Sequence, residues 1–536
     1  MDLHDQPTVP GGTGDTTQPI GPANTGAGPG VPPMPPGVSQ GATNRRGLSR
    51  RKLLVGAGTA VIAGGGVGIA ALAQQGGLNL FWHNTQSNNA EIGHLLRRVG
   101  FGATPAELQE YAAYGYEGAV DRLINYQQIA DDEMEQRLKA LNLDLNKVQN
   151  QQRWWLLRMA WTRRPLLEKM TLFWHGHLTS SYHKVGGNKV FMRMINQNQL
   201  LRAHAFDTFD NLLLGITGDP AMLVYLDLNT SRKNKPNENY ARELMELFTL
   251  GLGHYSQQDV SQAAVALTGW HASGLQGRYL PGSHNNQIKT FMGKSGNFDY
   301  KDIIHTLTNH PAAPWFISRK LFTFFAYENP SDDDLKPLVD AYNTSNHNIG
   351  AVMRALLLSP QFRSSKAYRA RIKSPAEFVV GAYRALNVQN NATGLPVQMT
   401  QMGQTLFDPP SVAGWTGDKV SALWMNSGAW LTRLNYIDLL LAGTRGRNNA
   451  YKPVNLQQII NDNHIDSPER FVDYFGSYLL DGNMAQDRRA QFVAYFNQPD
   501  EKSKEHVTLA NGKSYPLGRA RGTLYLIMAS PEYQLN

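Results

Sequence analysis

Residues 234–253 read NKPNENYARELMELFTLGLG, and this stretch is the clearest indication of the fold class. Pro236 ends any earlier helix, and Asn237 is a residue type that often caps a helix N-terminus. At about 100° per residue, the polar side chains fall on one side of a helix and the apolar side chains on the other. Gly251 and Gly253 provide a stop. The stretch therefore predicts an amphipathic helix.

The polar side of this helix is unusually rich in charge. Glu238, Arg242 and Glu246 stand at i, i+4 and i+8, so we expect the guanidinium to lie between two carboxylates. Asn239 and Glu243 share the same side. A solvated helix surface is the ordinary explanation, and a polar side turned into a cleft is the alternative. On the second reading the candidate catalytic residues are Glu238, Arg242, Glu243 and Glu246, with Arg242 ordering the carboxylates.

The composition limits the classes of function. The chain of 536 residues carries 51 Lys and Arg against 43 Asp and Glu, a net charge of +8. This excess is mild for the length and no long basic run occurs, so nucleic acid binding is not favoured. Cysteine is absent, which excludes disulfides, thiolate metal sites and Cys nucleophiles.

The N-terminal region differs from the rest of the chain. Residues 1–48 are rich in Gly and Pro, and we expect them to be disordered. Residues 49–75 resemble a twin-arginine export signal, because Arg50 and Arg51 precede an uncharged run at 53–73 that ends in a small-x-small pattern. The export machinery is then one partner, and the protein is expected in the periplasm, cell envelope or medium. A retained membrane anchor at 53–73 remains the alternative.

Helical patterns dominate residues 88–536. We expect a mainly α, large orthogonal multi-helix domain with a small irregular or β insertion at 270–300 and a candidate internal boundary at 443–455. Two helix starts are well marked. Thr104 is followed by Glu107, and Ser256 by Asp259, which is the spacing of a capping box.

Seven segments together resemble one bacterial family, the domain-of-unknown-function 1800 family. The resemblance implies a large, exported, helical protein without an agreed activity, and a co-exported sulfatase-like-fold protein as a candidate partner. In this chain the segments are 94–108, 169–181, 237–253, 263–270, 315–325, 373–386 and 406–417.

The most suggestive metal ligands are His175 and His177. On a helix they lie about 200° apart, so they converge only if the helix ends near His175 and Gly176 turns the chain. With Glu243, and with Glu246 nearby, they would bind a divalent metal through His and carboxylate ligands. The alternative is an ordinary helix end with His near the negative pole of the dipole.

Two further groups are open to a functional and an ordinary interpretation. Arg319 and Lys320 would bind an anion, or would be the solvated side of a helix. The aromatic residues, with three polar residues nearby, would form a sugar-stacking surface or anchor loops in the core. They are Trp270, Trp415 and Trp424, and the polar residues are His271, His284 and Asp418.

The sequence leaves two classes of function open. The first is a hydrolase-like activity on envelope or extracellular polymer, with or without the assistance of a metal. The second is a non-enzymatic exported scaffold or binding protein that acts with a co-exported partner. No Ser nucleophile motif, phosphate-binding loop or dinucleotide fingerprint directs the choice.

Overall fold

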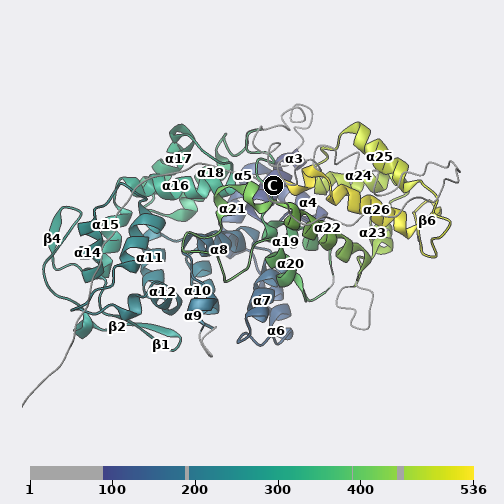
Figure 1. The fold of residues 1–536 in the computed structure, drawn as a ribbon. Coiled ribbons are helices and arrows are strands. Elements are labelled where there is room, and N and C mark those ends of the chain that lie inside the picture. Colours follow the sequence, from purple (N-terminus) through teal and green to yellow (C-terminus); the bar gives the residue numbers. More distant parts are fainter. Residues whose placement is uncertain (1–87, 187–191, 389, 444–451) are drawn as a thin grey trace, which may run out of the picture. The chain divides into compact units, whose positions relative to one another are not determined.

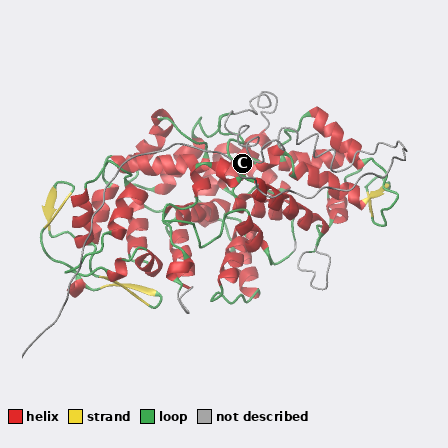
Figure 2. Ribbon diagram, in the orientation of Figure 1, coloured by secondary structure: helices red, strands yellow, loops and turns green. Residues whose placement is uncertain are grey.

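The computed structural model describes residues 88–186, 192–388, 390–443 and 452–536, all within one compact unit, Leu48–Asn536. The predicted disordered region, the predicted signal or anchor and most of the predicted boundary at 443–455 lie outside the described residues. No helix in the described part is long and apolar enough to cross a membrane. The described residues are mainly helical, as predicted, with strands in three small hairpins (Figures 1 and 2).

The first half of the described chain is a series of short and medium helices. They are α3 (Asn88–Val99), α4 (Pro105–Ala113), α5 (Gly115–Ile124), α6 (Asp132–Ala140), α7 (Val148–Trp161), α8 (Pro165–His177), α9 (Tyr182–Val185), α10 (Met192–Ala203), α11 (Phe209–Thr217), α12 (Pro220–Tyr225), α13 (Asn239–Glu243), the π-helix η4 (Leu244–Thr249) and α14 (Gln257–Ala266).

The second half continues in the same way after two hairpins. It contains β1 (Trp270–Ser273), β2 (Gln276–Tyr279), β3 (Lys289–Phe291), β4 (Lys294–Gly296), α15 (Tyr300–Thr308), α16 (Ala312–Phe325), α17 (Asp332–Thr344), α18 (Ile349–Leu358), α19 (Pro375–Ala385), α20 (Leu395–Gln401), α21 (Thr416–Lys419), η6 (Ser421–Trp424), α22 (Ser427–Ala442), α23 (Leu456–Asp462), α24 (Pro468–Leu479), α25 (Gln486–Phe496), β5 (His506–Thr508), β6 (Ser514–Pro516), α26 (Leu517–Met528) and α27 (Pro531–Gln534).

Local sequence signals set several of these boundaries. The capping boxes predicted at Thr104 and Ser256 are both formed, with Glu107 and Asp259 as the partners. Each box satisfies backbone N–H groups that the first helical turn leaves without partners. The insertion predicted at 270–300 is confirmed as two antiparallel hairpins, β1–β2 and β3–β4. The third hairpin, β5–β6, was not predicted.

Helix α8 is the element that the two hydrophobic cores share. Every residue of α8 except Gly176 is buried. Phe173 and Trp174 belong to a core formed mainly by α3, α5 and α10–α18, whereas Leu172 belongs to the core built mainly from α7 and α19–α27. A helix that is buried on all sides has no solvated side, and α8 therefore packs against elements of both cores.

The stretch at 234–253 is shorter as an α-helix than predicted. Asn237 accepts a bond from the N–H of Asn239 (2.9 Å), and regular α-helix extends only over α13. From Leu244 the chain continues as the π-helix η4, whose i→i+5 bonding changes the angle between successive side chains. The predicted apolar side is buried, and Gly251 and Gly253 adopt positive φ at the predicted stop.

Candidate functional site

The two histidines of α8 face different surroundings. The helix runs without a break through His177, so the two side chains point in different directions. His175 packs against the rings of Trp155, Phe407 and Trp415. His177 packs against those of Phe173, Trp174, Phe248 and Phe316. The turn at Gly176 that their convergence required does not occur.

Both imidazoles are neutral at neutral pH, because burial lowers the pKa of His175 and of His177 to about 3. The Nε2 atom of His177 lies 3.0 Å from the carbonyl oxygen of Phe248. A carbonyl only accepts, so Nε2 carries the proton and Nδ1 the lone pair. This bond joins the end of α8 to η4 through the backbone of the 234–253 stretch.

Gly176 serves as a docking point for a distant loop. A Cβ atom there would lie 3.0 Å from a carboxylate oxygen of Asp418 and 3.4 Å from the Trp415 ring. A Cβ on Gly414 would lie only 2.1 Å from the carbonyl oxygen of Gly176. The missing side chains therefore let the loop at 411–419 lie directly on α8.

The predicted metal ligands do not come together. Within the described residues, no group of three His, Asp or Glu side chains is placed to hold a metal ion. His175, His177 and Glu243 therefore do not form such a group. Glu243 is half-buried, and its pKa is raised by burial and then by the charge of Glu246. The function proposed below therefore uses no metal at these residues.

The charged side of the 234–253 stretch is partly enclosed, but by its own chain neighbours. Arg242 donates to Glu238 (3.1 Å), and Glu238 also accepts from the Ser261 hydroxyl (2.6 Å). Glu246 accepts from the Tyr255 hydroxyl (2.9 Å). The expected ion pair between Glu246 and Arg242 is not formed, because Arg242 pairs with Glu238 alone. The π-helix explains the difference, because it turns Glu246 away from the position that an α-helix would give it.

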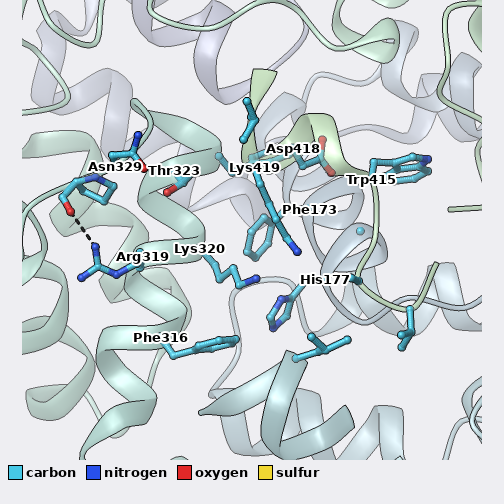
Figure 3. A pocket seen from close by; sticks show the side chains of 17 residues that line it. Phe173, His177, Phe316, Arg319, Lys320, Thr323, Asn329, Trp415, Asp418 and Lys419 are labelled. Carbon is cyan, nitrogen blue, oxygen red and sulfur yellow. Dashed lines mark hydrogen bonds between the residues drawn. The ribbon is translucent and has the colours of Figure 1, made fainter. Parts of the chain in front are cut away.

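A pocket of about 350 Å³ lies beside the end of α8 (Figure 3). Its walls come from α8, η4, α16 and the segment at 412–420. The lining is mostly apolar and contains a small number of polar groups, which is typical of sites for small ligands. The lining residues are Phe173, Gly176, His177, Leu247, Phe316, Arg319, Lys320, Thr323, Phe324, Asn329, Pro330, Val412, Ala413, Trp415, Asp418, Lys419 and Val420.

Three basic side chains reach this pocket. Arg319 is held in place by donating to the carbonyl oxygen of Pro330 (2.8 Å). Lys320 and Lys419 have no hydrogen-bond or ion-pair partner among the residues that the structure describes, and Figure 3 shows both side chains directed toward His177. Burial and then the charge of Lys419 lower the pKa of Lys320 to about 8. An anion between the two ammonium groups would relieve their repulsion.

Asp418 supplies the carboxyl group of the pocket. Burial raises its pKa to about 7, although the charges of Arg371 and Lys169 act in the opposite direction. Arg371 holds this segment by donating to the backbone carbonyl of Asp418 (2.8 Å). A carboxyl group with a pKa near 7 gains and loses a proton readily at neutral pH, which general acid–base catalysis requires.

Sequence reasoning found parts of this pocket without joining them. Arg319 and Lys320 were expected either to bind an anion or to face solvent, and Asp418 was noted beside Trp415. Lys419 was missed. Trp270 packs instead against Tyr279 and Tyr300 in the β1–β2 region, so the three tryptophans do not form one stacking surface. No local pattern relates α16 to a loop about 100 residues later in the chain.

Comparison with known proteins identifies a family for the part of the chain that contains the seven segments. A family model described as "Protein of unknown function (DUF1800)" matches residues 94–535. The chain belongs to the DUF1800 family. Neither a curated protein nor a solved structure gives a significant match.

Four of the seven segments that carry the DUF1800 resemblance contribute side chains to the pocket. These four segments are 169–181, 237–253, 315–325 and 406–417. Asp418, Lys419 and Val420 follow the last of them directly. The pocket is therefore where four of the seven segments meet in space, and we take it as the candidate functional site.

Proposed function

We propose that this pocket is the reaction site of a hydrolase-like enzyme whose substrate combines an anionic group with an apolar or ring-shaped body. The observation that carries the proposal is the placement of Asp418 together with two unpaired ammonium groups in one apolar pocket. The rings of Phe173, Phe316 and Phe324 would contact the body of the substrate.

Binding follows from the charges at the pocket. The ammonium groups of Lys320 and Lys419 would hold the anionic group of the substrate, because neither has a hydrogen-bond or ion-pair partner among the described residues, although Lys320 lies 5.1 Å from the centre of the Phe316 ring. Lys320 is partly buried among apolar side chains, which strengthens this attraction, whereas Lys419 is exposed. The anion would also favour the charged form of Lys320.

Acid–base chemistry falls to Asp418. In its ionised form the carboxylate accepts a proton from a water molecule while the water oxygen bonds to the acyl carbon of an ester. The bond to the leaving group then breaks, and the proton passes from Asp418 to the leaving oxygen. The nearby ammonium groups stabilise the negative charge that develops on the substrate during these steps.

We further propose that the reaction takes place after export, on envelope or extracellular material. The twin-arginine-like pattern at 49–75 supports this location. The alternative is an exported binding protein that acts with a co-exported partner, for which the exposed Val420, which lines the pocket, and the exposed Leu423 of η6 would supply apolar contact surface.

Turnover of matched esters tests the proposal. We expect the purified protein to hydrolyse para-nitrophenyl hemisuccinate, which is anionic, faster than the neutral para-nitrophenyl butyrate. Asp418→Asn should lower kcat by at least about 100-fold, since acid–base groups contribute about 10²–10⁴-fold. Lys336→Met, which changes an exposed lysine on α17, serves as the control. Binding of the anionic ester without turnover would favour the binding protein over the enzyme.

A further inference from the structure

A second group of charged side chains lies between the two cores, and its member Lys169 also acts on Asp418 of the pocket. Its members interact electrostatically with one another. They include five buried basic groups and two acidic groups. The basic members are Arg97, Arg98, Lys169, Arg369 and Lys373, and the acidic members are Asp481 and Glu377.

Other groups already occupy both carboxylates. Asp481 accepts from Arg97 (2.7 and 2.8 Å), from Arg369 (3.0 Å) and from the Tyr368 hydroxyl (2.8 Å). Glu377 pairs with Lys169 and accepts from the backbone N–H of Ser374 and the side-chain amide of Asn536. Neither carboxylate forms a hydrogen bond or ion pair with Lys373 among the described residues.

Two of the basic side chains have nitrogen atoms without a partner. The guanidinium of Arg97 bonds only through Nη1, and its Nε and Nη2 atoms are buried without a hydrogen bond. The ammonium of Lys373 lies 3.7 Å from the centre of the Tyr533 ring and has no hydrogen-bond acceptor among the described residues. The two buried Arg97 donors are unfavourable without acceptors, and more so because they are charged. Asn536 Oδ1, from the lining of the same cavity, is a buried acceptor that also lacks a partner.

Arg97 and Lys373 line one small cavity. Its volume is about 30 Å³, and Tyr478, Tyr533 and Asn536 also line it. Such a volume holds one water molecule or one ion of similar size. Glu377 reaches the same cavity, but the contacts with Lys169, Ser374 and Asn536 described above offset its charge.

We propose that this cavity binds one small inorganic anion of about the size of chloride, between the guanidinium of Arg97 and the ammonium of Lys373. The anion supplies the acceptor that Arg97 Nε and Nη2 and the Lys373 ammonium lack. It also offsets part of the positive charge of Arg97 and Lys373, which both line the cavity. Burial and the charges of Arg369 and Arg97 lower the pKa of Lys373, and a bound anion opposes that effect.

Thermal unfolding in two salts tests this site. Sodium chloride is compared with sodium gluconate at equal ionic strength, because gluconate is too large for the cavity. We expect chloride to raise the Tm by about 2 °C in a saturable way, since a ligand that binds only the folded state stabilises it by mass action. Lys373→Met should abolish the difference between the salts. Lys336→Met and the double variant Lys320→Met, Lys419→Met should keep it.

Two results would overturn the proposal. One is equal stabilisation of the wild-type protein by chloride and gluconate, and the other is an unchanged chloride effect in Lys373→Met. If Lys373→Met does not fold, the site is tested by anomalous diffraction from crystals of the wild-type protein soaked in bromide. An anomalous peak between Arg97 and Lys373 supports the site, and a cavity without such a peak contradicts it.

Discussion

Replacement of Gly414 by alanine tests how the 411–419 loop lies on α8. Gly414 has φ of +79°, and an added Cβ would lie 2.1 Å from the carbonyl oxygen of Gly176 and 3.1 Å from its carbonyl carbon. These are backbone atoms of a helix that is buried nearly throughout, so the helix cannot move aside locally. Gly403 offers a matched control, because it also has positive φ (+99°) and has open space around its Cβ position.

The expected free energies follow from these two situations. Gly403→Ala should lower the free energy of unfolding by about 1–2 kcal/mol, the penalty of a left-handed backbone for a residue with a Cβ. Gly414→Ala should lower the free energy of unfolding by about 1–3 kcal/mol more than Gly403→Ala does, because the added Cβ overpacks the contact with α8. Urea denaturation followed by circular dichroism measures the difference. Equal losses in the two variants would refute the direct contact of the loop with α8, and with it the enclosure of the pocket.

Three further predictions concern titrating groups. Since His175 has a pKa of about 3 in the folded protein and about 6.5 when unfolded, the unfolded state binds more protons between these values, and stability falls as the pH falls through this window. His175→Phe should lower the number of protons taken up on unfolding by about one, so that Tm falls less steeply as the pH is lowered. An unchanged slope of Tm against pH would argue against a buried neutral imidazole. The rate of ester hydrolysis should rise with pH as Asp418 ionises near pH 7 and fall as Lys320 loses its proton near pH 8; Asp418→Asn should lose the acidic limb, and a profile that is flat from pH 5 to 9 would exclude both groups. Glu243→Gln should leave the metal content of the purified protein, measured by elemental analysis, equal to that of the wild type, whereas a loss of metal would restore Glu243 as a ligand.

Local signals in the sequence predicted local structure. The capping boxes at Thr104 and Ser256 depend on residues three apart, and both are present. The apolar side of the 234–253 stretch is likewise a local pattern. A signal for the missed β5–β6 hairpin was available too, because Asn511-Gly512 is a typical turn sequence between paired strands.

The pocket depends on contacts that local patterns do not contain. Gly176 was expected to turn the chain, since glycine permits that conformation, but it remains helical and accommodates Trp415 and Asp418. The pKa of Asp418 arises from burial against α8, about 240 residues earlier in the chain. The π-helix after Glu243 gave no recognisable signal and altered the predicted positions of the charged side chains.

The central claim is that Lys320 and Lys419 make the pocket a site for an anion with an apolar body. Isothermal titration calorimetry with naphthalenesulfonate tests it most directly. We predict that the double variant Lys320→Met, Lys419→Met binds at least about 10-fold more weakly than the wild type, because a hydrogen bond to a charged group contributes about 1.5–3 kcal/mol. Lys336→Met should bind like the wild type. Equal affinity in the double variant and the wild type would contradict the claim.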